Sequence, residues 1–382
     1  MVPPPLQLSH NSTVLHLEHR LEGGRTVNRW VEDCLSSDTC QSTVQEVHLG
    51  PDFLDSLSLA QGFFVLEELG EYRNLQRLYI RGQRPNTDKD NEDHLVTTTS
   101  LSLRGLTTLL RNARQQGHML QVLHVEDVTW HLSTGDAHDC WEEFQTALQH
   151  QTELQTVSFL QWEMVTSHGE PFVTQHRKDA VWQLDSFLQT LCCLSQLTVL
   201  HVELASANRC TFDGNALARL FSSTQLLELH LSHIPLTKMH LRMLAWAVRK
   251  DPLQQLSLKY GGLGDDDLTK LCFYLGNCRD LQQVDFTGNE FGNVGCTALA
   301  ESLAHSTTLS RLSVLDNPHI GPEGYASLAK LLHQNTNLVG LQAGGSTTAN
   351  PYRASMKESM EKNQQLQQAV VDARNTKAAH AA

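Results

Sequence analysis

The chain has 382 residues, with 29 Lys and Arg against 42 Asp and Glu, and a formal net charge of −13 at pH 7. This acidic balance argues against nucleic acid or an anionic membrane surface as the partner, because both are bound through basic faces. No apolar run approaches the roughly 18 residues of a membrane-spanning helix, and the opening MVPPPLQLSH lacks the regions of a signal peptide.

The nine cysteines are scattered without a CxxC pair, which is typical of thiols in a reducing compartment. We therefore expect a soluble cytoplasmic protein, with the nucleus as an alternative location. Neither a membrane nor a nucleic acid is expected as a partner, and the chain is predicted to be a monomer.

A repeated pattern follows residues 1–10, which we expect to be flexible. The pattern reads LxxLxL, and its apolar residues at positions four and six alternate as in a strand. A partial copy covers Thr13–Leu17, and the further copies begin at Val44, Leu75, Leu120, Leu154, Leu197, Leu226, Leu253, Leu281, Leu309 and Leu338.

Each strand segment is followed by apolar residues at helical spacing, such as Leu271 and Leu275 in one repeat and Leu299 and Leu303 in the next. Each repeat therefore predicts a strand, a turn and a helix. Successive copies at Leu253, Leu281 and Leu309 start 28 residues apart.

This recurring segment resembles the leucine-rich-repeat proteins, specifically the ribonuclease-inhibitor-like class with repeats near 28 residues. The resemblance implies an α/β fold, a leucine-rich-repeat solenoid or horseshoe with a parallel concave sheet and convex helices. The dimensions of the two elements favour the same curvature. Strands stack about 4.8 Å apart whereas helices are about 10 Å wide, so an array with one of each per repeat must bend with its strands on the inner side. We expect about eleven repeats over residues 11–350, then a C-terminal capping helix and a frayed tail over residues 351–382.

The family also places an asparagine after the strand. Asn289 and Asn317 hold that place, whereas Ile234 and Gly261 replace it elsewhere, so we expect an interrupted asparagine ladder.

Two repeats are unusually long, with 45 residues between Leu75 and Leu120 and 43 between Leu154 and Leu197. The first insert is charged and begins near Arg81, and the second contains Trp162. Both follow a strand, so both are expected at the same rim. They represent either drift at a tolerant site or a recognition element.

Position five of the strand pattern is expected to point away from the core. Five of its eleven residues are histidine, where 20 histidines in 382 residues would place fewer than one by chance. This column reads His16, His48, Tyr79, His124, Ser158, His201, His230, Ser257, Asp285, Ser313 and Gln342. A glutamate lies two residues from each histidine, namely Glu18, Glu46, Glu126, Glu203 and Glu228.

Several interpretations of this His–Glu pattern stay open. It can be a protein-binding surface, a pH-responsive surface whose carboxylates raise the imidazole pKa, or a solvated face repeated by duplication. Imidazole and carboxylate at His201, Glu203, Glu228 and His230 would also suit zinc, but no HxxxH or CxxC spacing supports it. We therefore predict no metal site.

No P-loop, GxSxG, HExxH or kinase glycine loop occurs, so no catalytic residue, cofactor or enzyme activity is predicted. The prediction is a non-enzymatic protein-binding scaffold or adaptor. Its candidate partner-binding residues are His16, Glu18, Glu46, His48, Tyr79, His124, Glu126, Trp162, His201, Glu203, Glu228 and His230.

Three alternatives belong to other classes. Ran GTPase-activating proteins resemble this chain but typically end in an acidic segment, which we do not find. A substrate-recognition subunit of a ubiquitin ligase would lead us to expect a preceding F-box-like segment. The sensor part of an immune receptor would be accompanied by a nucleotide-binding domain.

Overall fold

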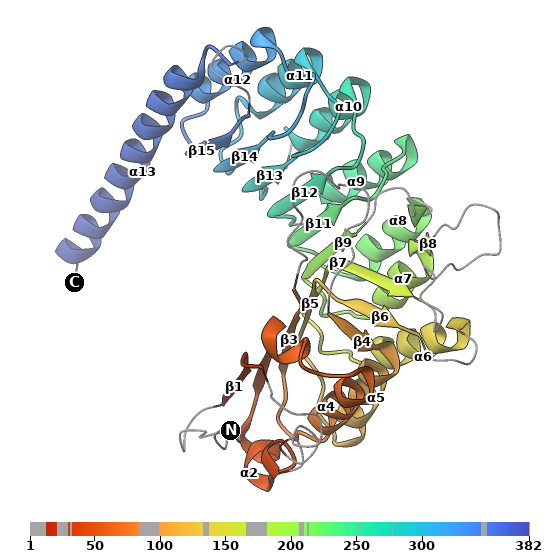
Figure 1. Ribbon diagram of the computed structural model, residues 1–382. Coiled ribbons are helices and arrows are strands. Elements are labelled where there is room, and N and C mark those ends of the chain that lie inside the picture. The colour runs from red at the N-terminus through yellow and green to blue at the C-terminus, as the bar shows by residue number, and fades with distance from the viewer. Residues whose placement is uncertain are drawn as a thin grey trace. The chain divides into compact units, whose positions relative to one another are not determined.

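A computed structural model describes residues 13–20, 30, 33–83, 99–132, 137–165, 182–205, 210–211, 214–250, 252–276, 278–344 and 350–381. The chain divides into two compact units, which we call the amino-terminal unit (residues 1–212 and 222–225) and the carboxyl-terminal unit (residues 213–221 and 226–382). Both alternate strands with helices (Figure 1). The predicted flexible segment 1–10 and most of the first insert lie outside the described residues.

Parallel strands in the amino-terminal unit follow the predicted repeat starts. The strands are β1 (Val14–Leu17), β2 (Glu46–Leu49), β3 (Arg77–Arg81), β5 (Val122–Glu126), β7 (Thr156–Val165) and β9 (Val199–Leu204). They pair in that order and in parallel. Burial alternates along all of these strands except β7, as the LxxLxL pattern predicts for a sheet with one face on the core.

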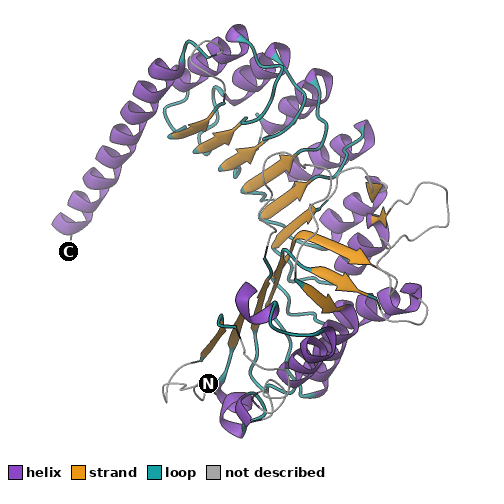
Figure 2. Ribbon diagram, in the orientation of Figure 1, coloured by secondary structure: helices purple, strands orange, loops and turns teal. Residues whose placement is uncertain are grey.

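Helices cover one face of this sheet, and its other face is not covered by helices (Figure 2). The helices are α2 (Asp38–Thr43), α3 (Pro51–Leu54), α4 (Leu59–Gly70), α5 (Leu103–Gln115), α6 (Ala137–Gln149) and α7 (Leu184–Leu191). The α4 helix begins at a capping box, in which Ser58 and Gln61 bond each other's backbone N–H groups. This separation of helices from strands leaves the other sheet face open for side chains that are not needed in the core.

The two long repeats and the repeats that follow them carry additional short strands that sequence analysis missed. Strand β4 (Ser100–Ser102) pairs with β6 (Thr129–His131), and β6 pairs with the second half of β7. Likewise β8 (Trp182–Gln183) pairs with β10 (Cys210–Thr211). Runs of two or three residues have no periodicity of their own, so only pairing with a neighbouring repeat makes them strands.

The carboxyl-terminal unit contains the more regular repeats. Its strands are β11 (Glu228–Ser232), β12 (Gln255–Lys259), β13 (Gln283–Asp285), β14 (Arg311–Ser313) and β15 (Gly340–Gln342), all parallel and in that order. The helices are α8 (Gly214–Ser223), α9 (Lys238–Lys250), α10 (Asp265–Leu275), α11 (Asn293–Leu303), α12 (Pro322–Gln334) and α13 (Arg353–Ala381). Helices α9 to α12 lie on one side of these strands (Figure 1).

Leucine rows form the core of this unit. Leu256 pairs in register with Val284, and Val284 with Leu312; their exposed fractions are 1%, 2% and 1%. One repeat cannot bury such a face by itself, so each repeat completes the core of its neighbour.

The predicted asparagine ladder spans two repeats. The Asn289 side chain accepts the N–H groups of Gly261 and Leu263, at 3.1 Å each, and donates to the carbonyls of Leu258 and Phe286 at 2.8 and 2.9 Å. Asn317 donates to the Phe286 carbonyl at 3.0 Å. These amides satisfy backbone groups in turns where no strand partner is available.

The carboxyl end caps the last repeat through α13. Asn363, which is buried, donates to the carbonyls of Leu332, Asn335 and Leu338 at 3.0–3.2 Å. Met356 is buried beside them. The helix continues to Ala381, so the tail that we expected to fray has helical backbone. Among the described residues, no helix combines the length and the apolar character needed to cross a membrane.

Candidate functional site

The open face of the amino-terminal unit carries the predicted residue column; we call it the amino-terminal strand face. Strand register pairs His16 with His48, His48 with Tyr79, Tyr79 with His124, His124 with Ser158 and Ser158 with His201. The register within this unit is therefore the predicted one.

Four rings of the column lie against one another. The centroids of His16 and His48 are 4.5 Å apart, and those of His48 and Tyr79 are 4.4 Å apart with planes 7° from parallel. His124 is tilted against Tyr79 at 5.9 Å. Because each ring restricts its neighbours, the column presents a surface whose side chains are largely ordered before any partner binds.

Carboxylates on the same face hold the rings and two arginines. His48 Nε2 lies 2.7 Å from Glu46 Oε1, and Arg77 Nη1 donates to Glu46 Oε2 at 2.7 Å. Burial by itself would raise the pKa of Glu46, but the hydrogen bonds from His48 and Arg77 outweigh it and lower that pKa. Burial, reinforced by the Glu46 charge, raises the pKa of Tyr79. Glu46 is thus ionised at neutral pH and is bonded to both His48 and Arg77.

A second cluster surrounds Glu126. Arg81 Nε donates to Glu126 Oε2 at 2.9 Å, and His124 Nε2 lies 3.6 Å from the same oxygen. The close contact with His124, helped by the Arg81 charge, lowers the pKa of Glu126 to about 2. Sequence analysis missed Arg77 and Arg81, although both occupy outward positions of the strand beginning at Leu75.

The remaining predicted residues of this unit behave differently from one another. His16 and Glu18 form an exposed pair, with Nδ1 and Oε1 3.5 Å apart. The His201 Nδ1 lies 3.2 Å from the Ser158 hydroxyl. Gln161 hydrogen-bonds Glu203 from a left-handed backbone position, next to an irregularity in the pairing of β7 with β9.

Trp162 does not belong to this surface. Its side chain is 4% exposed, and its ring packs 5.4 Å from Phe159, 6.1 Å from Phe187 and 6.3 Å from Trp141. The irregular pairing of β7 turns Trp162 toward the helices, where its aromatic area is buried. The prediction that Trp162 contacts a partner is wrong for this reason.

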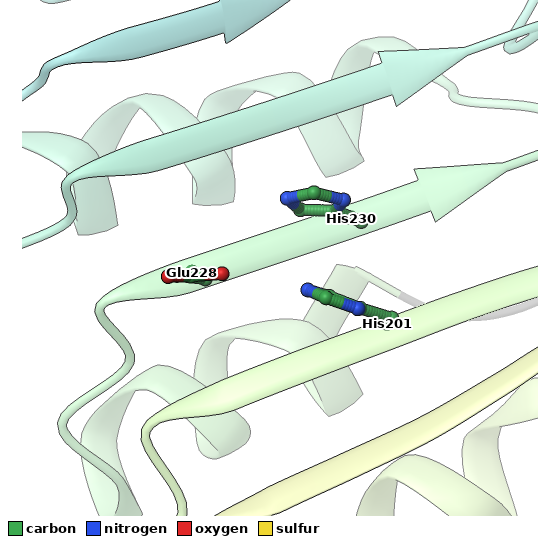
Figure 3. Close-up of side chains that lie close together, drawn as sticks. All are labelled: His201, Glu228 and His230. Atoms are coloured by element: carbon green, nitrogen blue, oxygen red, sulfur yellow. The ribbon is translucent and has the colours of Figure 1, made fainter. Parts of the chain in front are cut away.

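In the carboxyl-terminal unit, β11 presents Glu228 and His230 on its open face; we call the open face of β11–β15 the carboxyl-terminal strand face. Figure 3 shows both side chains on the same side of β11, and His201 projecting from β9. Gln255 donates to Glu228 at 2.8 Å, and burial raises the pKa of Glu228.

His230 corrects our expectation that imidazole pKa values rise on this column. Burial, helped by the Lys259 charge, lowers the pKa of His230 to about 4, although Asp285 acts in the opposite direction. The ring is therefore neutral at physiological pH, and desolvation rather than the neighbouring carboxylates controls it.

A groove of about 330 Å³ lies on the carboxyl-terminal strand face. Polar residues line it above the apolar row of Leu256, Val284 and Leu312. Asp285, which lines the groove, pairs through Oδ2 with Lys259 Nζ at 3.1 Å. The groove is open and has both polar and apolar lining, which suits an extended peptide segment better than a small apolar ligand.

Comparisons with known proteins give only distant structural similarities. No family model matches the chain, and no curated protein matches it. Similar solved structures include an internalin from Listeria monocytogenes, at 14% identity over 81% of this chain and 82% of that one, with a TM-score of 0.36. The C-terminal domain of tropomodulin from Caenorhabditis elegans shares 15% identity over 43% of this chain and 98% of that one, at 0.36. The structure of a TLR13–ssRNA13 complex shares 13% identity over 78% of this chain and 35% of that one, with a TM-score of 0.38.

At these identities and TM-scores the likeness gives no information on function. The fold follows instead from the molecule itself: strands that recur with the LxxLxL pattern, pair in parallel and in sequence order within each unit, and alternate with helices on one side. On that evidence the chain has the leucine-rich-repeat fold.

Proposed function

We propose that this chain is a non-enzymatic protein-binding scaffold of the ribonuclease-inhibitor-like class, acting in the cytoplasm, and that its strand faces are the binding surfaces. The observation that carries this proposal is the ordered column of His16, His48, Tyr79 and His124, braced by ion pairs. Aromatic and arginine side chains are enriched in protein interfaces. Side chains already held in place lose less conformational entropy when a partner binds.

The amino-terminal strand face also presents both signs of charge in fixed positions. Arg77 and Arg81 are partly exposed, with 46% and 64% of their side chains accessible, while Glu46 and Glu126 lie beside them. Such an arrangement selects partners through complementary charge and excludes those with the wrong pattern. We infer that the partner is another protein, bound by the chain as a monomer.

Site-specific photo-crosslinking tests which face binds. Benzoylphenylalanine is placed at His16 or Arg77 on the amino-terminal strand face, and at the exposed helix positions Glu142 or Lys330 as matched controls. We expect protein adducts from the strand positions and none from the helix positions. Adducts from the helix positions alone would contradict the proposal. A parallel GTP-hydrolysis assay with a panel of GTPases tests the regulator class, which no specific observation favours.

A further inference from the structure

The groove on the carboxyl-terminal strand face contains a cation with no counter-charge. Arg311, the first residue of β14, lines the groove and is exposed. Within the part of the chain that the structure describes, its guanidinium makes no ion pair and no hydrogen bond. An unpaired arginine at the edge of a polar groove is a ready donor for an incoming acid.

The neighbouring acids are already engaged. Asp285 pairs with Lys259 at 3.1 Å and accepts from the backbone N–H and hydroxyl of Thr287 at 3.0 and 2.6 Å. Glu228 accepts from Gln255 at 2.8 Å. Asp285 is therefore already neutralised by Lys259, and Glu228 lies three strands away from Arg311 in the sheet.

Register explains why Arg311 is unpaired. Arg77 occupies the same first position of its strand and lies opposite Glu46, which binds it at 2.7 Å. The residue opposite Arg311 in the same register is Gln283. Its neutral side-chain amide occupies the position that the Glu46 carboxylate occupies opposite Arg77. Arg77 therefore has a carboxylate partner on the adjacent strand, whereas Arg311 has none there.

The strand on the other flank offers Arg311 no carboxylate either. Arg311 is opposite Gly340 of β15, where a Cβ would lie 3.3 Å from Arg311 Cγ. The glycine therefore lets the aliphatic stem of Arg311 lie close to β15 without supplying a counter-charge. Gln283 and Gln342 line the same groove and can exchange hydrogen bonds with a peptide backbone.

We propose that this groove binds an acidic peptide segment of a partner protein, and that Arg311 is the anchor for one Asp or Glu side chain of that segment. This inference rests on the proposed scaffold function and names the chemistry of its partner. A carboxylate fits better than a phosphate because a single unpaired cation matches a single negative charge, whereas phosphate sites gather several donors and cations.

The test is an NMR titration of the full chain with Ac-Gly-Glu-Gly-NH2, Ac-Gly-Gln-Gly-NH2 or inorganic phosphate. The Arg311 Nε–Hε signal and the side-chain amide signals of Gln283 and Gln342 report binding. We expect saturable shifts with the Glu peptide and an affinity at least about fivefold weaker for the Gln peptide. Equal affinities for both peptides, no shift, or tighter binding of phosphate would overturn the proposal.

Variants separate anchoring from folding. Arg311→Ala should abolish the shifts at Gln283 and Gln342, and Arg311→Lys should weaken binding while retaining it. Gly340→Val should weaken binding because the added side chain displaces the stem of Arg311. Arg279→Ala removes the same charge from an exposed position outside the groove and should change nothing. Unchanged binding in Arg311→Ala, with its melting temperature also unchanged, would overturn the anchor.

The two proposals fail in distinguishable ways. If strand-face crosslinks form at His16 and Arg77 but Arg311→Ala binds the Glu peptide normally, only the anchor is wrong. If the Glu peptide binds through Arg311 while crosslinks form solely at Glu142 and Lys330, the groove stands and the scaffold assignment of the amino-terminal strand face fails.

Discussion

The phenol ring of Tyr79 lies flat on the imidazole of His48, with centroids 4.4 Å apart and planes 7° from parallel. The two residues are opposite each other on β2 and β3, and His48 is in turn bonded to Glu46 at 2.7 Å. Contacts across strands, as between His48 and Tyr79, and contacts within a strand, as between His48 and Glu46, therefore order this face together.

Truncating a leucine row should destabilise the carboxyl-terminal unit. Leu256 is 1% exposed and pairs in register with Val284, so Leu256→Ala removes buried methyl groups and leaves a cavity. We expect a loss of about 2–5 kcal/mol in the free energy of unfolding, measured by urea denaturation. Val284→Ala should also destabilise. Val294→Ala, at a side chain 63% exposed, is the control and should change it by less than about 0.5 kcal/mol.

Removing the side-chain amide of Asn289 should also lower the free energy of unfolding. Asn289→Ala leaves the N–H groups of Gly261 and Leu263 and the carbonyl of Leu258 without their present partner. Because each unsatisfied buried group costs about 1–3 kcal/mol, we expect a loss above about 2 kcal/mol. The exposed Asn74→Ala is the matched control. Equal stability of the two variants would show that water replaces the amide.

Acid should weaken the amino-terminal unit through Glu126. Its pKa of about 2 lies below the ordinary value of 4.5, so its contribution is complete above about pH 4.5 and is lost as the pH falls toward 2. We expect about 1–2 kcal/mol, less than the full shift implies, because water reaches the ion pair. Glu126→Gln should flatten the stability profile over that range, whereas Glu301→Gln, at an exposed helix position, should leave it unchanged.

His230 should titrate far below an ordinary histidine. Its folded-state pKa of about 4 lies below the usual 6.5, so the unfolded chain takes up the proton first and stability falls as the pH drops from about 6.5 to about 4. An NMR titration of the ring signal, assigned with His230→Gln, should give a midpoint near 4. A midpoint at or above 6.5 would mean that the neighbouring carboxylates, rather than burial, control the ring.

Much of the fold was readable from the chain because its information is local and repeated. Apolar residues at positions one, four and six recur at each strand, so the strand positions and their register follow without knowledge of any long-range contact. The same regularity placed His16, His48, Tyr79 and His124 in one column, since equivalent positions of stacked repeats must face the same way.

What depended on pairing between repeats could not be predicted. Strands β4, β6, β8 and β10 are too short to show periodicity, and the irregular pairing that buries Trp162 leaves no mark in the LxxLxL pattern. The carboxylate partners of Arg77 and Arg81, the low pKa of His230 and the unpaired state of Arg311 all depend on which side chain lies on the adjacent strand. Burial and charge pairing are properties of neighbours in space, and only the tertiary structure decides those neighbours.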